Sequence, residues 1–147
     1  MVKYVKGDLF STDCDIIAHG CNCRGGFGSG VARIVALKYP KARELYLEKY
    51  EEVGWKLGDV QFVTTVSGKI IANCATQDAY LPRGVCHASY DGILRAMDKV
   101  KCFAQPKNLS IAIPKIGAGL AGGDWSKIEK ILNRVFSNYD VTVYYLD

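Results

Sequence analysis

The feature that most constrains the fold of this chain is where its glycines lie. Of 15 glycines, more than half fall in two short windows, residues 25–30 (GGFGSG) and 117–123 (GAGLAGG). Each window follows an apolar run typical of a buried strand and precedes a segment with helical spacing of its apolar residues. Backbone N–H groups in such a turn can point at one anion, and the helix N-terminus adds positive potential. The sequence therefore predicts two anion-binding loops that could hold a diphosphate between them, with two tight turns as the alternative.

Strand and helix patterns alternate through the rest of the chain. Short apolar runs indicate strands, which cover KYV near the start and residues 15–20, 59–66, 69–76, 109–114 and 141–146. Ser67-Gly68 between two of these runs indicates a hairpin turn. Helical or amphipathic spacing indicates helices, which cover residues 29–39, 41–53, 87–103 and 124–136. This alternation predicts an α/β fold with a mixed central sheet and helices on both faces.

Length and composition restrict the class of protein. A chain of 147 residues is expected to form a single domain, spanning residues 1–147. Its hydrophobic content of 49% and charged content of 23% are ordinary for globular proteins, which excludes the disordered and fibrous classes. The formal net charge of +4 is mild and the lysines are spread along the chain, so a basic stripe that binds nucleic acid is not indicated.

Targeting and metal-binding signals are also not indicated. No apolar run reaches 18 residues, and the first ten residues, MVKYVKGDLF, hold no apolar signal region, so we expect a cytoplasmic protein without a membrane span. The default expectation is a monomer. Cys21 and Cys23 do not have the C-x-x-C spacing of a zinc site, and only two histidines are available. We therefore expect free thiols, no bound metal and no cofactor.

The second window also fits the dinucleotide-binding pattern G-x-G-x-x-G, through Gly117, Gly119 and Gly122. It follows a strand, opens a helix, and has the acidic residue Asp147 at the end of the next strand. A Rossmann domain needs further strand–helix units after that acidic residue, and none follows here. We therefore do not favour this alternative.

Four segments together resemble the macrodomain family. They are GDLF at residues 7–10, IIAHGCN at 16–22, the first window with Gly30-Val31-Ala32, and IPKIGAGLAGGDW at 113–125. The resemblance covers nearly the whole chain. Within this family, the four segments look most like the small branch that contains the ADP-ribose-1″-phosphate phosphatases and the human terminal ADP-ribose protein glycohydrolase. It implies a three-layer α/β/α sandwich with ADP-ribose or ADP-ribose-1″-phosphate as the ligand.

The resemblance also implies which residues bind that ligand. Asp8 would accept a hydrogen bond from the adenine amino group, and Leu9 would offer backbone contacts beside it. Leu146 would pack on the adenine face. The residues alone indicate a turn residue at Asp8 and a core residue at Leu146. Asn22 would contact the distal ribose, although the residues alone indicate a turn equally well. The two loops would enclose the diphosphate, with contacts from Gly28, Ser29, Gly30, Val31, Ala32, Ile116, Gly117, Ala118, Gly119 and Leu120.

The chain departs from the glycohydrolase of this branch at two catalytic positions. That enzyme uses a lysine nucleophile and an aspartate directly after the GL of its second loop, and these positions align with Gln77 and Ala121. Glutamine cannot form a Schiff base with an opened ribose, and alanine cannot accept a proton. A lysine-adduct route is therefore not expected, although Gln77 and Tyr80 would still lie near the distal ribose.

Two titratable residues remain as catalytic candidates. His19 ends a strand beside the first loop and is either a catalytic or substrate-contacting imidazole or a satisfied core histidine. Asp124 precedes a helix and is either its N-cap or a general base that activates water. Arg83 either reaches a phosphate of the ligand or is solvated, and we favour solvation. His87 is expected to begin a helix and to be exposed.

Three functions are consistent with these observations. The leading hypothesis is a phosphatase that releases phosphate and ADP-ribose from ADP-ribose-1″-phosphate, because the two anion loops and GAGLAGGDW resemble those enzymes. The first alternative is a module that binds ADP-ribose without turnover, since the lysine and aspartate are missing. The second is a hydrolase that removes ADP-ribose from protein or nucleic acid, with ADP-ribosylated macromolecules as its partners.

Overall fold

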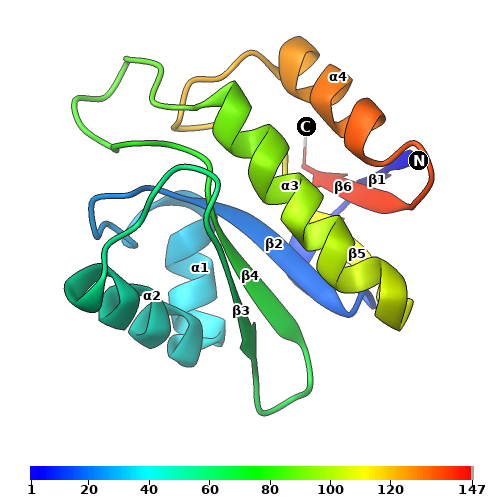
Figure 1. The fold of residues 1–147 in the computed structure, drawn as a ribbon, viewed down its shortest axis with the longest axis horizontal. Coiled ribbons are helices and arrows are strands. Elements are labelled where there is room, and N and C mark those ends of the chain that lie inside the picture. Colours follow the sequence, from blue (N-terminus) through cyan, green and yellow to red (C-terminus); the bar gives the residue numbers. More distant parts are fainter. Residues whose placement is uncertain (147) are drawn as a thin grey trace.

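A computed structural model describes residues 1–146, which contain one six-stranded sheet (Figure 1). The strands are β1 (Val2–Lys6), β2 (Ile16–Cys21), β3 (Val60–Thr64), β4 (Ile70–Ala75), β5 (Ile111–Ile113) and β6 (Val141–Tyr145). They lie in the order β1-β6-β5-β2-β4-β3. β3 runs antiparallel to β4, and the other neighbouring strands are parallel. The predicted mixed sheet is confirmed, with β1 at one edge and the predicted hairpin, β3–β4, at the other.

The helices form two pairs on opposite faces of this sheet (Figure 1). They are α1 (Gly30–Lys38), α2 (Pro40–Glu52), α3 (Tyr90–Ala104) and α4 (Trp125–Val135), with short 3-10 helices at Leu9–Ser11 and Gln105–Lys107. Successive side chains of β2 point to opposite faces of the sheet. Ile16 and Ala18 therefore lie in the core beneath α3 and α4, whereas Ile17 lies in the core beneath α1 and α2. The three-layer α/β/α sandwich is confirmed.

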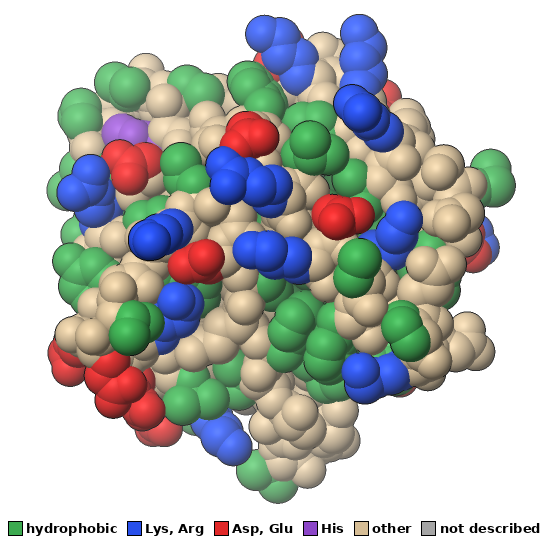
Figure 2. Space-filling view, viewed as in Figure 1, with side chains coloured by type: hydrophobic (Ala, Val, Ile, Leu, Met, Phe, Trp, Pro, Cys, Tyr) green, Lys and Arg blue, Asp and Glu red, His purple; other side chains and the backbone are tan. Residues whose placement is uncertain are grey.

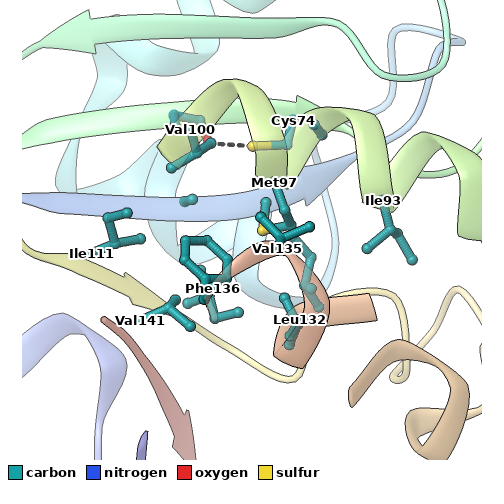
Figure 3. Close-up of a cluster of buried hydrophobic side chains, with 14 of the residues drawn as sticks. Cys74, Ile93, Met97, Val100, Ile111, Leu132, Val135, Phe136 and Val141 are labelled. Atoms are coloured by element: carbon teal, nitrogen blue, oxygen red, sulfur yellow. Dashed lines mark hydrogen bonds between the residues drawn. The ribbon is translucent and has the colours of Figure 1, made fainter. Parts of the chain in front are cut away.

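The larger of the two cores lies beneath α3 and α4 (Figure 3). Met97 from α3 and Leu132 from α4 are fully buried there, together with Phe136 just after α4. The Cys74 thiol of β4 lies in the same core and donates a hydrogen bond to the Ala72 carbonyl oxygen at 3.6 Å. Burial raises the pKa of this thiol. All six cysteines are free, and the buried ones act as small apolar residues.

The strand order places the two glycine windows next to each other. β1, β6, β5, β2 and β4 are parallel, so their carboxyl ends lie along one edge of the sheet. The window at 25–30 follows β2, the window at 117–123 follows β5, and β2 and β5 are neighbours. Ligands of open α/β sheets bind in the crevice outside the carboxyl ends of the strands. The fold therefore places both windows where such a crevice is expected.

One helix begins later than its pattern predicts. The helix expected at residues 87–103 starts at Tyr90, because Ser89 is its N-cap and its hydroxyl accepts a hydrogen bond from the Gly92 N–H at 3.0 Å. His87 was predicted to begin this helix and to be exposed, and that prediction is wrong. It is half-buried in the preceding loop, where its backbone N–H donates to the Ala121 carbonyl oxygen at 2.8 Å.

The face over α3 and α4 carries mixed charge. Figure 2 shows Lys and Arg side chains interspersed with Asp and Glu, rather than gathered in one stripe. In the part of the chain that the structure describes, every helix is too short or too polar to cross a membrane.

Candidate functional site

A cavity of about 530 Å³ lies at the carboxyl edge of the sheet, between the two glycine windows. Its walls come from the segments that follow β2, β4 and β5. The residues that line it are Gly20, Cys21, Asn22, Gly26, Phe27, Gly28, Ser29, Gly30, Val31, Ala32, Gln77, Tyr80, Leu81, Arg83, Pro114, Lys115, Ile116, Gly117, Gly119, Leu120 and Ala121. All ten residues predicted to contact the diphosphate line the cavity except Ala118, which packs partly buried against the core beneath α3 and α4.

The first window ends in a helix N-terminus without a side-chain cap. Ser29 is the N-cap residue of α1, but its side chain makes no capping hydrogen bond. The N–H groups of the first turn, on Gly30, Val31 and Ala32, have no acceptor within the helix. These three residues line the cavity, whereas α3 and α4 each begin with a side-chain cap. The first turn of α1 is therefore available to an anion, which the helix dipole also favours.

Asn22 holds the first window in shape. Its Nδ2 donates to the Gly26 carbonyl oxygen at 2.7 Å, and its Oδ1 accepts hydrogen bonds from the backbone N–H groups of Arg24 at 2.8 Å and Gly26 at 3.1 Å. The buried Tyr46 of α2 donates its hydroxyl proton to the Asn22 main-chain oxygen at 2.7 Å and accepts from the Gly25 N–H at 3.1 Å. Asn22 is thus a turn residue that also lines the cavity, and its contact with a distal ribose stays a prediction.

Gly20 forms part of the cavity floor where β2 ends. A Cβ atom on Gly20 would lie 2.5 Å from Thr76 Oγ1 and 3.4 Å from Ile116 Cγ1, so only glycine fits without movement of the neighbours. Thr76 is fully buried, and its hydroxyl has no hydrogen-bond partner within residues 1–146. The floor is therefore packed tightly between the ends of β2, β4 and β5.

The second window forms a closed turn. Gly117 has a φ of +79°, which favours glycine, and its carbonyl oxygen accepts a hydrogen bond from the Gly123 N–H at 2.8 Å. Lys115, directly before this turn, lines the cavity. Its ammonium lies 5.7 Å from the ring centroids of both Trp125 and Tyr145. Because Tyr145 belongs to β6, this cation lies on the β6 side of the cavity.

A third segment, residues 78–87, joins the two windows, and we call it the bridging loop. It is closed at its base, where the Asp78 N–H donates to the His87 carbonyl oxygen at 3.1 Å. On one side, the Cys23 N–H donates to the Asp78 carbonyl oxygen at 3.0 Å. On the other, the His87 N–H donates to Ala121 in the second window. The bridging loop is thus fastened to both walls of the cavity.

The bridging loop brings Tyr80 and Arg83 to the cavity. The Tyr80 ring lies against Gly26 of the first window, so close that a Cβ there would be 2.6 Å from the ring. Next to Arg83, the Pro82 carbonyl oxygen lies 2.8 Å from Nε2 of His87. Arg83 is exposed, as the sequence predicts, but it also lines the cavity. No other side chain among residues 1–146 pairs with its guanidinium.

Asp8, Leu9 and Leu146 follow the carboxyl ends of β1 and β6 and are not among the residues that line the cavity. The Gly7 N–H donates to the Tyr145 carbonyl oxygen at 2.8 Å, which holds these two ends side by side. Asp8 is exposed, Leu9 is buried and Leu146 is 71% exposed. Their contacts with adenine stay predictions, and their position marks the end of the cavity that such a base would occupy.

His19, the first catalytic candidate, is fully buried beneath α1 and α2. Its Nε2 lies 2.7 Å from Asn73 Oδ1, and its ring packs edge-on against Phe27 with 5.4 Å between centroids. Burial lowers the pKa of His19 to about 4, although the hydrogen bond to Asn73 opposes this shift. His19 is not among the residues that line the cavity. The structure therefore corresponds to the core-histidine alternative and does not support the predicted catalytic role.

Asp124, the second candidate, is the N-cap residue of α4. Its carboxylate accepts hydrogen bonds from the Ser126 hydroxyl at 2.7 Å and from the Ser126 N–H at 2.9 Å, and these bonds lower the pKa of Asp124. The side chain is exposed and lies outside the cavity lining. The N-cap alternative is confirmed, and this position does not support the predicted role as a general base.

The polar side chains among the lining residues carry amide, hydroxyl, thiol and cationic groups. Among the lining residues that the structure describes there is no Asp, Glu or His. Sequence reasoning missed Lys115, and for Arg83 it favoured solvation over contact with a phosphate. The available signal was position: Lys115 lies between a strand and the second window, and Arg83 lies in the loop after β4, the neighbour of β2.

A family model, curated relatives and solved structures all match this chain over most of its length. The family model described as Macro domain matches residues 18–132. A protein of the yeast Debaryomyces hansenii named ADP-ribose 1″-phosphate phosphatase is 29% identical, with all of both chains covered. A protein of the same name from Lodderomyces elongisporus is 30% identical over 99% of each chain. A solved structure of a Bacteroides thetaiotaomicron protein of unknown function is 31% identical over 98% of this chain and 97% of that one, with a TM-score of 0.87.

Proposed function

The chain belongs to the macro domain family, and we propose that its cavity binds ADP-ribose and that the protein hydrolyses ADP-ribose 1″-phosphate. This extends to the chain the activity named for its yeast relatives, which align with it over nearly their full length. The observation that carries the proposal is the uncapped first turn of α1, which faces the second glycine window across one cavity. An uncapped helix N-terminus beside a glycine-rich loop suits a diphosphate.

The order of elements along the carboxyl edge suits the shape of this ligand. Asp8 and Leu146 mark one end, after β1 and β6, and would receive the adenine. The loops after β5 and β2 come next and would enclose the diphosphate. The loop after β4 follows, with Gln77 and Tyr80 at the cavity, and would meet the distal ribose and its phosphate.

The reaction adds water to the phosphorus atom of the 1″-phosphate. The bond from phosphorus to O1″ breaks, O1″ takes a proton, and the products are ADP-ribose and inorganic phosphate. The lining side chains include no carboxylate or imidazole, so this chain contributes mainly by holding the substrate and by stabilising negative charge with fixed donors and cations. A modest turnover rate is expected from such a site.

The direct test is to incubate the pure protein with ADP-ribose 1″-phosphate and to measure phosphate and ADP-ribose together. Equal amounts of both products, formed in proportion to enzyme concentration, would support the proposal. Release that does not exceed the buffer control at high enzyme concentration would reject phosphatase activity.

The composition of the cavity also favours a second candidate, an ADP-ribose-binding module without turnover. The lining residues supply donors and cations but no general base, and Gln77 and Ala121 replace the catalytic pair of the glycohydrolase. Calorimetric binding of ADP-ribose without phosphate release would favour this candidate. Failure to bind ADP-ribose at all would reject both.

A further inference from the structure

We propose that Arg83 distinguishes ADP-ribose 1″-phosphate from ADP-ribose by binding the terminal phosphate. This inference rests on the proposed function and adds to it the residue that sets the substrate preference. Three observations support it: the position of the bridging loop along the sheet edge, the way this loop is fastened, and the unpaired guanidinium of Arg83.

The first observation is topological. The strand order β1-β6-β5-β2-β4 places the loop after β4 on the far side of the diphosphate loops from Asp8 and Leu146. A ligand with its adenine at β6 and its diphosphate between the loops after β5 and β2 must extend its distal ribose toward the bridging loop. Tyr80 and Arg83 of this loop are among the residues that line the cavity.

The second observation is that the bridging loop is held in place. Its base is closed by the hydrogen bond from Asp78 to His87, and separate backbone hydrogen bonds tie it to Cys23 and Ala121. The His87 imidazole contacts the Pro82 carbonyl oxygen at 2.8 Å, directly beside Arg83. A charged group on a fastened loop loses less entropy on binding than one on a free segment.

The third observation concerns charge. Arg83 is one of the residues that line the cavity, and its guanidinium has no ion pair or hydrogen bond within residues 1–146. The guanidinium of Arg24, in contrast, is paired with Asp78 at 3.0 Å. A guanidinium presents two parallel N–H donors that match phosphate oxygens. The other lining cation, Lys115, lies on the β6 side near Tyr145. The two cations are therefore placed for different parts of the ligand.

The experiment compares calorimetric affinities for ADP-ribose and ADP-ribose 1″-phosphate in the wild-type protein and in Arg83→Gln, Arg83→Lys and Lys115→Gln. Arg43→Gln is the matched control, because it removes the same charge from an exposed position on α2 that does not line the cavity. Phosphate release is measured in the same samples, and thermal melting verifies that each variant is folded. The titrations are run at low temperature, where hydrolysis is slow enough for the phosphorylated ligand to stay intact.

The wild-type protein should bind the phosphorylated ligand more tightly. Arg83→Gln should weaken that binding roughly 10- to 150-fold, as expected for hydrogen bonds to a charged group, and change ADP-ribose affinity less than about twofold. Arg83→Lys should recover part of the preference. Lys115→Gln should lower the affinity for both ligands by a similar factor, and Arg43→Gln should lower neither affinity.

Other outcomes separate the two proposals. An Arg83→Gln variant that keeps the preference, or that loses affinity for both ligands equally, overturns the role of Arg83 while wild-type phosphate release still supports the phosphatase. A wild-type protein that prefers the phosphorylated ligand through Arg83 but releases no phosphate overturns the phosphatase alone. Equal wild-type affinity for the two ligands overturns the inference about Arg83.

Discussion

The hydroxyl of Tyr46 donates a hydrogen bond to the main-chain oxygen of Asn22 at 2.7 Å, which connects α2 to the first glycine window. The same hydroxyl accepts from the Gly25 N–H and lies 3.0 Å from Asn22 Oδ1. Burial is the main cause that raises the pKa of Tyr46, so the hydroxyl keeps its proton at neutral pH. A side chain outside the cavity thus helps set the shape of one of its walls.

Tyr46→Phe should therefore lower both stability and ligand affinity. The change leaves the Gly25 N–H and the Asn22 main-chain oxygen without their partner, which costs about 1–3 kcal/mol of unfolding free energy. It should also weaken ADP-ribose binding, because the 25–30 window is no longer held in its bound shape. Chemical denaturation and calorimetry measure the two effects. The exposed Tyr50→Phe on the same helix is the control, and equal behaviour of the two variants would contradict this prediction.

Gly20→Ala should deform the cavity floor. Its new Cβ would lie 2.5 Å from Thr76 Oγ1, and overpacking of this kind costs about 1–3 kcal/mol. Affinity for ADP-ribose should fall together with the unfolding free energy, as measured by calorimetry and denaturation.

Adding Thr76→Ala to Gly20→Ala should restore the stability that Gly20→Ala loses. Thr76→Ala removes the hydroxyl that the new methyl group meets. The remaining contacts, with Ile116 Cγ1 at 3.4 Å and Thr76 Cβ at 3.8 Å, are at ordinary van der Waals distances. The Thr76 hydroxyl has no partner within residues 1–146, so its loss alone should change stability by less than about 1 kcal/mol. A double variant as unstable as Gly20→Ala would show that the clash with Thr76 is not the cause.

Variants of Asp124 should separate its capping role from a catalytic one. Asn can accept the same hydrogen bonds from Ser126, so Asp124→Asn should keep phosphate release and most of the stability, whereas Asp124→Ala should lower the melting temperature. Phosphate release by folded protein should be similar in both variants. A folded Asp124→Asn protein that releases no phosphate would restore the general-base interpretation.

His19 should make the protein less stable in mild acid. Burial lowers the pKa of its folded form to about 4 from 6.5, so the unfolded state binds the proton first as the pH falls. The stability that the neutral imidazole contributes is complete above about pH 6.5 and is lost toward pH 4, by about 3 kcal/mol in total. An NMR titration of the imidazole should show a pKa near 4. An ordinary value near 6.5 would contradict the buried, neutral state.

The sequence predicts the element order well because that order follows from local pattern. Apolar runs and helical spacing indicate the hairpin, the four helices and the two glycine windows, and each is present. The role of His19 could also have been read from local pattern. Side chains alternate along a strand, so His19 shares a face with Ile17 and Cys21, both of which are buried in one core.

Arg83 shows what local pattern could not provide. The Pro82-Arg83-Gly84 segment has the composition of a solvated loop, and nothing in its own residues indicates that it faces a cavity. That position depends on the backbone hydrogen bonds that tie the bridging loop to Cys23 and Ala121, which are distant in sequence. The direction of a loop side chain is set by such long-range contacts, which a single sequence does not display.

The place of β6 in the sheet has a consequence for the order in which the protein can assemble. Within residues 1–146, β1 pairs only with β6, which lies between it and β5, so β1 can join the sheet only after residues 141–145 have been synthesised. In a nascent chain that lacks residues 141–145, β2, β4 and β5 can pair with one another, but β1 has no strand to pair with. Closing a contact over nearly the full length of the chain is slow. The end of the cavity beside Asp8 is therefore the last to form, and an incomplete chain should not bind the nucleotide.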